Sequence, residues 1–322
     1  MRRLWFAIAI LLLAPGIRAS GDGPVAKAQE QFNVGDFSAA ITTLQAATRA
    51  LPRDAAVYYW LGRCYFELRK YDQAIRYGDR SVKLAPNNSV FLLWLGRAYG
   101  REAEAGHSFW MALRSKDALE DAIEADPKNI AARRDLAHFY FAAPWIVGGS
   151  KKKARAEIAS IAAIDPIEGK LAQADYDKQN GDKQKAEDDL KAVLQSKPKT
   201  VAEYYEVADF FASHPNPQLV QQSVDGAAAI APSDLRLLYY RGVVLILEGQ
   251  KLDEAERYLK AYLAQTPARS DYPPRSDART WLGHVYQRQG KRMDAAQQYQ
   301  FALRLDPHSD FARESLNQLE SQ

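Results

Sequence analysis

The side chains best suited to catalysis in this sequence are five histidines, one cysteine and a serine that follows two glycines. The histidines form no HxxxH or HExxH pair on one helix face, so we expect no metal site. Cys64 is the single cysteine, which excludes an internal disulfide and a cysteine-based zinc site. Gly148-Gly149-Ser150 is not a nucleophile elbow, because that turn needs glycine on both sides of the serine. The sequence therefore predicts a protein that is not an enzyme and that uses no cofactor.

One short segment has the composition of an anion-binding turn. Ser150 is a good N-cap for a helix that begins at Lys151, and Gly148 and Gly149 precede it. Lysines at 151–153 oppose the helix dipole, which favours acidic residues in a first turn. Free N–H groups and lysines at such an end can hold a phosphate or carboxylate, so Gly148, Gly149, Ser150 and Lys151 are predicted to bind an anion. The alternative is a solvated run of lysines.

The composition is that of an ordinary folded protein. Of 322 residues, 47% are hydrophobic and 26% are charged, which is too apolar for a disordered chain. The net charge is +3, and three of the 43 basic residues (Arg2, Arg3 and Arg18) lie at the start, leaving 40 basic against 40 acidic residues. A nearly neutral chain lacks the basic excess that nucleic-acid binding requires, so we expect no nucleic-acid partner.

The first residues resemble an export signal. A basic start at Met1-Arg2-Arg3 precedes eleven apolar residues at 4–14, then a Pro-Gly break and a small residue, Ala19, before Ser20. This order is typical of a cleaved signal peptide over 1–19, and about eleven residues are too few to cross about 30 Å of hydrocarbon. We expect a protein secreted across an inner membrane, in the periplasm, with no membrane span after cleavage. The alternative is that the segment is kept as an anchor.

Prolines divide the remaining chain into units of similar length. They recur at intervals of 32 to 41 residues, and each closes a run with helical periodicity: Pro52, Pro86, Pro127, Pro166, Pro198, Pro232, Pro267 and Pro307. Within a unit, Tyr58, Leu61, Gly62 and Tyr65 form one helical stripe, and a seam of small residues around Ala74 follows on a second helix. Such a period predicts a solenoid of helix pairs that bury their apolar faces against their neighbours.

These residues resemble the tetratricopeptide repeat family. The match is carried by Tyr58, Leu61, Gly62, Tyr65, Ala74 and Pro86, and again by Leu282, Gly283, Tyr286, Ala295, Tyr299 and Pro307. The resemblance implies an all-α, right-handed superhelix of about eight repeats and a capping helix. The expected units are 20–53, 54–87, 88–128, 129–166, 167–199, 200–233, 234–268 and 269–308, with the cap at 309–322.

Two units are longer than the rest. The third carries seven extra residues around 101–110, where good helix formers predict that both helices lengthen by about one turn. The fourth carries five extra residues around 142–150. Insertions in solenoids fall on one face and often serve binding, so Phe109, Trp110 and Trp145 are predicted contacts. The alternative is that these three rings pack on one another as a small separate core.

The resemblance also implies which residues line the inner groove. Carried onto this sequence, the groove positions include Tyr59, Arg63, Arg97, Arg134 and His138, and Arg101 lies one turn beyond Arg97. Like charges four residues apart repel on a helix, and an arginine fork suits a carboxylate. One hypothesis is that the groove grips an acidic peptide or a terminal carboxylate. The alternative is internal pairing, for example of Arg63 with Glu67.

The function predicted from these patterns is stoichiometric. We expect a scaffold that holds a segment of a protein or peptide partner in its concave groove. The alternative is an assembly subunit of an envelope complex that oligomerises through its ends or flanks. Neither the composition nor the motifs identify the partner.

Overall fold

The computed structural model describes residues 23–267 and 269–321. The expected signal segment, 1–19, lies outside these residues. Within them the chain forms helices and no strand, and none of the helices is long and apolar enough to span a membrane. The predicted all-α solenoid is confirmed.

Eight antiparallel helix pairs follow one another along the chain, and one last helix covers the end. The pairs are α1 (Pro24–Asn33) with α2 (Phe37–Ala50), α3 (Ala55–Glu67) with α4 (Tyr71–Leu84), α5 (Ser89–Gly106) with α6 (Phe109–Ala125), α7 (Ile130–Ala142) with α8 (Lys151–Ile164), α9 (Pro166–Gln179) with α10 (Lys183–Gln195), α11 (Val201–Ser213) with α12 (Pro217–Ile230), α13 (Arg236–Glu248) with α14 (Leu252–Gln265), and α15 (Arg275–Arg288) with α16 (Arg292–Leu305). The final helix is α17 (Asp310–Glu320), and a single 3₁₀ turn, η1 (Trp145–Val147), precedes α8.

The local sequence explains where these helices begin and how the chain turns between the two helices of a pair. Side chains of Asp, Asn, Ser or Thr cap many N-termini, and Thr200 and Glu203 complete a capping box on α11. In most pairs the turn places a residue in the left-handed region, as Gly35 does between α1 and α2. Arg69 and His107 adopt the same conformation in the next two pairs. The tight pairing of α3 with α4 depends on Gly62, where a Cβ would lie 3.3 Å from the Ala74 carbonyl oxygen.

The expected lengthening of the third pair is confirmed. Helix α5 has 18 residues and α6 has 17, against 13 in α3 and 14 in α4. The extra turns carry both helices beyond their neighbours, and η1 lies against α6. The inserted residues therefore form a wall that the other pairs lack.

Tyrosines join each early pair to the next. Tyr99 donates to the Asp79 carboxylate at 2.7 Å, and Tyr140 donates to Glu120 at 2.7 Å. In each case the first helix of one pair reaches the second helix of the pair before, 20 residues back. These two bonds therefore help to fix how the third and fourth pairs sit on their predecessors.

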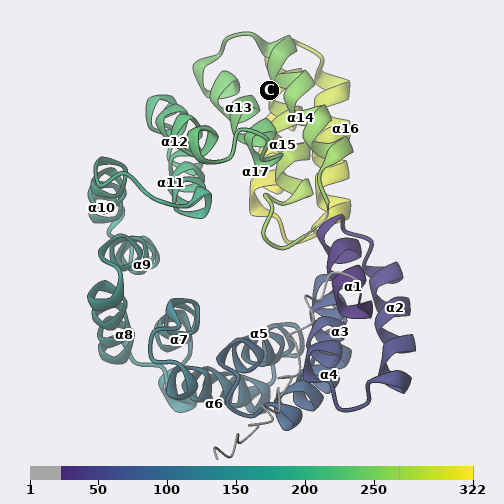
Figure 1. The fold of residues 1–322 in the computed structure, drawn as a ribbon. Coiled ribbons are helices and arrows are strands. Elements are labelled where there is room, and N and C mark those ends of the chain that lie inside the picture. The colour runs from purple at the N-terminus through teal and green to yellow at the C-terminus, as the bar shows by residue number, and fades with distance from the viewer. Residues whose placement is uncertain (1–22, 268, 322) are drawn as a thin grey trace, which may run out of the picture.

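The helix pairs curve into a ring whose two ends meet. Figure 1 shows the N-terminal helices beside the C-terminal ones, with an open centre. Residues 269–271, just before α15, make the contact. Ser270 donates to Glu67 from its backbone N–H at 2.8 Å and from its hydroxyl at 2.9 Å. Arg269 reaches the Asn33 carbonyl and side-chain oxygens at 3.4 and 3.3 Å and lies over the Phe32 ring.

Candidate partner-binding site

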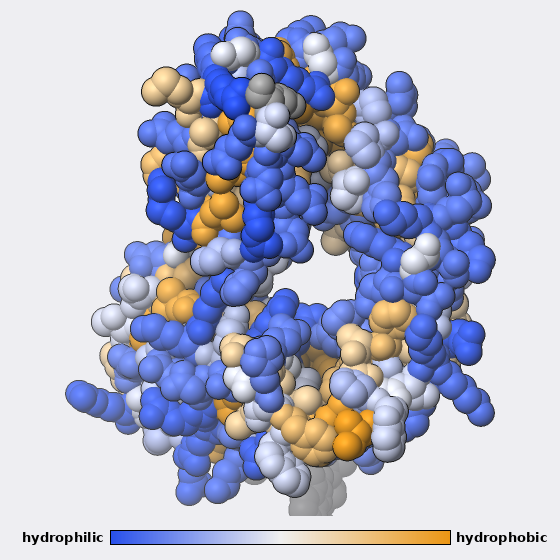
Figure 2. All heavy atoms as spheres, turned by 180° about the vertical axis from the view of Figure 1, so that it is seen from behind, coloured by the Kyte–Doolittle hydropathy of each residue, from blue (hydrophilic) through white to orange (hydrophobic). Residues whose placement is uncertain are grey.

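A cavity of about 770 Å³ lies on the inner side of the ring, between α5, α6, α7 and η1. Sites that bind organic ligands or side chains commonly measure about 300–1,000 Å³ and are mostly apolar. Its apolar wall is contributed by several elements: Phe66, Trp94, Phe109, Phe139, Ile146 and Val147. Figure 2 shows the opening through the ring from behind, with apolar surface gathered below it.

The long third pair creates this cavity. Gly100, Arg101, Ala103 and Glu104 line it from the last turns of α5, and Phe109 and Ala112 line it from the first turn of α6. The fourth unit supplies the opposite wall through Ala143, Pro144 and η1. Both insertions predicted from the sequence therefore meet at one place.

Three of the groove residues predicted from the sequence line the cavity: Arg97, Arg101 and His138. Arg97 bonds to Asp135 through Nε–Oδ2 at 2.5 Å and also lies over the Trp94 ring at 4.6 Å. Arg101 pairs with Glu104 at 2.8 Å, and both side chains are more than half exposed. His138 lies between this cavity and a pocket of about 50 Å³ beside Arg134. The cavity thus combines an apolar wall with paired charges at its rim.

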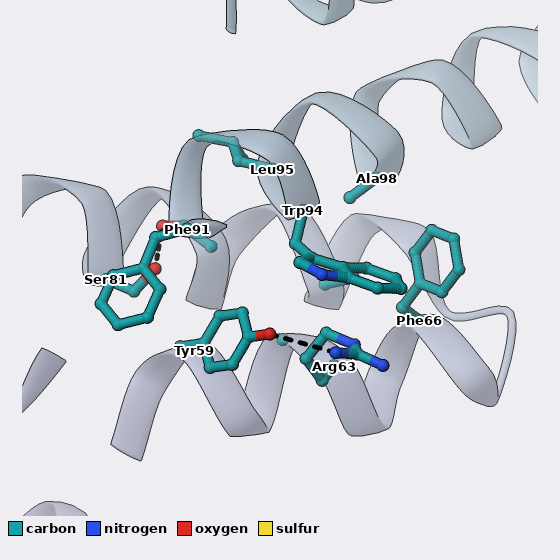
Figure 3. Close-up of a pocket in the computed structure, with 11 residues that line it drawn as sticks. Tyr59, Arg63, Phe66, Ser81, Phe91, Trp94, Leu95 and Ala98 are labelled. Atoms are coloured by element: carbon teal, nitrogen blue, oxygen red, sulfur yellow. Dashed lines mark hydrogen bonds between the residues drawn. The ribbon is translucent and has the colours of Figure 1, made fainter. Parts of the chain in front are cut away.

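Tyr59 and Arg63 belong to a separate, tightly packed contact between α3 and α5. The Arg63 guanidinium lies 3.4 Å from the Trp94 ring centroid, donates to Tyr59 at 3.0 Å and pairs with Glu67 at 3.8 Å. Figure 3 shows Arg63 between Tyr59 and Trp94, with Phe66 at the side. The space left there is about 10 Å³, room for about one water, so these residues do not enclose a ligand.

Arg134 is held by three acids from later helices. It bonds to Glu168 at 3.2 Å, to Asp175 at 2.7 Å and to Glu206 at 2.8 Å. Burial opposes the charge of Arg134, but the Glu206 hydrogen bond and the three negative charges outweigh it and raise the Arg134 pKa. Burial also raises the pKa of Glu206 and of Glu168, although Arg134 acts against both shifts. One cation against three acids leaves this part of the inner face acidic.

The structure thus pairs all four predicted groove arginines with acids of the same chain. Acids of the same chain therefore already relieve the repulsion among these arginines that an external carboxylate would relieve. The alternative of internal pairing, given for Arg63 with Glu67, anticipated this. Binding of an acidic segment stays a prediction. Arg101 is the most accessible of the four, and an exposed pair exchanges partners at little cost.

The aromatic residues of the insertions lie open to solvent. Phe109, Trp110 and Trp145 are 41%, 73% and 85% exposed, and Ile146 is 64% exposed. Phe109 and Trp110 touch edge to face, with ring centroids 5.6 Å apart. Such exposure does not fit the alternative of a small packed core, and large exposed apolar side chains gathered on one face mark interaction surfaces.

The glycine-serine segment forms the turn between η1 and α8. Ser150 caps α8 by accepting from the Lys153 N–H at 3.3 Å, as predicted. The N–H groups of Gly148, Gly149 and Ser150 donate to the carbonyls of Trp145, Pro144 and Tyr140. Lys151 donates to Asn180 at 2.6 Å. The anion site stays a prediction, with these donors already bonded to the chain itself.

Cys64 is fully buried, and burial raises its pKa to about 12. A thiol in this state is unreactive, as the sequence predicted. Within residues 23–267 and 269–321, no three His, Cys, Asp or Glu side chains are placed so that they could hold a metal ion.

Trp94 is the site residue that the sequence reasoning missed. It contacts Arg63 and Arg97 through its ring and lines the cavity. A signal exists in the sequence, because Trp94 lies one turn before Arg97 on the same helix face.

Comparison with known proteins bears on the fold. Residues 25–89 match the tetratricopeptide repeat family. The crystal structure of the APC/C hetero-tetramer Cut9–Hcn1 is similar over 95% of this chain and 57% of that chain, with a TM-score of 0.51 and 15% identity. The fold of the described residues is thus a solenoid of helix pairs like those of tetratricopeptide repeats, and the family match itself is confined to residues 25–89. Solenoids of such repeats use their concave faces to bind proteins or peptides.

Two further proteins show similarity to this chain. The CTR9 homolog of Arabidopsis thaliana is 32% identical over 117 residues, which are 36% of this chain and 10% of that protein. A tetratricopeptide repeat protein from Parabacteroides merdae covers 92% of this chain with a TM-score of 0.44 and 15% identity. The chain spans about a tenth of the curated relative it matches.

Proposed function

We propose that this protein is a non-catalytic scaffold, exported to the periplasm, that binds a segment of a partner protein in the cavity of its inner face. The observation that carries the proposal is the cavity itself. Two insertions that the repeat fold does not require lie together and form the apolar wall of a cavity whose volume suits a ligand or a side chain. The order of basic, apolar and small residues at 1–19 supports export.

The wall and rim indicate the chemistry of the segment. An apolar or aromatic side chain of the partner fits against Phe109, Phe139 and Ile146. A carboxylate of the same segment can replace Glu104 as the partner of Arg101, because that ion pair is exposed. An acidic segment would not extend further along the groove, since the three acids around Arg134 repel it.

Selection of displayed peptides tests this proposal. Random 12-residue peptides selected on the wild type should lose binding to Ala142→Trp, which fills the cavity from an exposed lining position. Ala50→Trp, at an exposed position on α2, is the matched control and should bind as the wild type does. Peptides that bind Ala142→Trp with unchanged affinity would place the binding face elsewhere.

Charge reversal tests the acidic part of the segment. Arg101→Glu should weaken binding of acid-bearing peptides at least tenfold and leave neutral apolar peptides less affected. The effect should shrink as salt is raised, because the pair at Arg101 lies at the surface.

The exposed tryptophans favour a second candidate function, that of an assembly subunit. Trp110 and Trp145 do not line the cavity, yet they are among the most exposed apolar side chains of the described residues. Light scattering on the purified protein separates the two functions. A dimer that Trp110→Ser/Trp145→Ser converts to a monomer, with peptide binding unchanged, would favour assembly.

A further inference from the structure

The ring is closed by a different kind of contact from those that join its repeats. Successive pairs bury apolar clusters between their helices, as Leu92, Leu119, Leu136 and Ile161 do in the middle of the arc. At the closure, no helix of the first two pairs packs against a helix of the last two pairs or against α17, among the residues that the structure describes. Residues 269–271 bridge the ends with polar bonds from Ser270 and Arg269 and one ring contact.

This closing contact is built for release. Ser270 is exposed, and the Arg269 bonds to Asn33 are long, at 3.3 and 3.4 Å. Arg269 and Glu67 also have partners on their own sides, since Arg269 pairs with Asp271 at 2.6 Å and Glu67 with Arg63 at 3.8 Å. If the contact opens, neither charge is left without a partner. Parting breaks polar bonds and returns the Glu67 carboxylate, whose side chain is 3% exposed, to water, and it separates no packed helix pair among the described residues.

The contact also bears on the cavity. Ser270 lines it together with Phe66 and Trp94, although Ser270 comes from the seventh connection and the other two from the second and third pairs. The same serine that bonds Glu67 thus forms part of the cavity wall. Glu67 is the last residue of α3 and follows Phe66 directly, so the closure and the cavity share one rim.

We propose that residues 269–271 form a latch that closes the ring over the cavity, and that its release opens the cavity to an extended chain. This inference rests on the proposed function, because it assigns the regulation of the same cavity. A small molecule can reach the closed cavity through the open centre of the ring. An extended segment with a folded domain at each end cannot be threaded through a closed ring, so it reaches the cavity only when the latch parts.

Arg269→Ala/Ser270→Ala removes the side-chain part of the latch and leaves the Glu67–Arg63 pair in place. Ring opening is measured by electron–electron distance between spin labels at Ala46→Cys on α2 and Ala264→Cys on α14, both exposed. The native Cys64 is fully buried and does not compete for the label. Arg257→Ala, an exposed position on α14, is the matched control, and circular dichroism verifies folding. Arg269→Ala alone provides a milder second variant.

Access to the cavity is measured separately with a cysteine at Ala112, a half-buried lining position. The probes are N-ethylmaleimide, which is small, and a 5-kDa polyethylene glycol maleimide, which behaves as a flexible chain. The latch variant should show a second, longer label distance, and the polymer should react at least threefold faster while the small reagent changes little.

An unchanged distance distribution in the latch variant would overturn the proposal. So would a longer distance with an unchanged ratio of polymer to small-reagent rates, since the latch would then not guard the cavity. Neither readout uses a partner peptide, so failure of the peptide selection would refute the proposed function without changing these results.

Discussion

Arg134 on α7 reaches across the inner face to Glu206 on α11, with Nη1 2.8 Å from Oε2. The two residues are 72 positions apart and belong to the fourth and sixth pairs. The bond therefore spans an entire intervening pair, whose Glu168 and Asp175 contact the same guanidinium. This cluster fixes the curvature of the middle of the ring.

Arg134→Ala should lower the free energy of unfolding by about 2 kcal/mol at pH 7, because it leaves three acids without their cation. The pKa values of Glu206 and Glu168 are already raised by burial, and loss of Arg134 raises them further. Protonation then relieves the repulsion, so the deficit should shrink as the pH falls toward 4. Urea unfolding at both pH values measures the difference.

Two companion variants separate charge from packing at Arg134. Arg155→Ala, at an exposed position on α8, should change stability little. Arg134→Ala/Glu206→Gln should recover part of the loss at pH 7. If the double variant is less stable than the single one, repulsion among the acids is not the cause.

Asp277→Asn should stabilise the protein at pH 8. Burial raises the pKa of Asp277 to about 6, with the Ser276 hydroxyl acting against the shift. A folded-state pKa above the unfolded one means that the carboxylate's destabilising effect develops as the pH rises from about 4 to 6 and is constant above that range. The gain should be about 1 kcal/mol at pH 8 and should vanish near pH 4. Asp310→Asn, at a position with an 81% exposed side chain, is the control.

The opposite pH dependence is expected at His284 in the same pair. Its ring nitrogens lie within hydrogen-bond distance of Tyr299 on α16 and Ser315 on α17, and burial followed by the charge of Arg288 lowers its pKa to about 4. Because the folded state disfavours the protonated ring, stability is lost as the pH falls from about 6.5 to 4. Hydrogen exchange in α17, corrected for the intrinsic rate, should therefore increase at pH 5.

His284→Gln should remove this acid sensitivity of α17, since glutamine does not titrate. His308→Gln, an exposed change in the turn before α17, should retain it. Equal exchange of α17 at pH 7 and pH 5 in the wild type would rule out the role assigned to His284.

Gly149→Ala should destabilise the protein by at least about 2 kcal/mol, because a Cβ at this position would lie 1.8 Å from the Ala143 carbonyl oxygen. Gly106→Ala meets nothing within 4 Å and should be neutral or slightly stabilising at the end of α5. Thermal melting of the two variants compares them directly. A neutral Gly149→Ala would show that the turn before α8 is not constrained as described.

The helix pairs could be predicted from the sequence because their signals are local. Proline spacing, the small seam at Gly62 and the helix formers in the third unit act within a few turns of chain, and the structure confirms the fold and the longer α5 and α6. The inert state of Cys64 followed from its aromatic neighbours in the same way.

The partners of the groove arginines could not be predicted in full. Glu67 lies one turn after Arg63, so their pairing was anticipated. Glu206 lies near Arg134 only because the solenoid curves, and that curvature is the sum of many small angles between helices. The contact between Ser270 and Glu67 depends on that curvature over six pairs, and a small error in each angle would separate them. The shared Trp94 ring was missed because its two arginines come from different pairs.

The recurring tyrosine bonds have a mechanical consequence. Tyr99 and Tyr140 each tie their pair to the one before over the same stretch of chain, so two successive joints are braced by the same kind of bond. Each of these joints is also held by apolar side chains packed between the helices. Tension on the two ends of this protein would thus be felt first at the contact between Ser270 and Glu67, which no helix packing reinforces among the described residues.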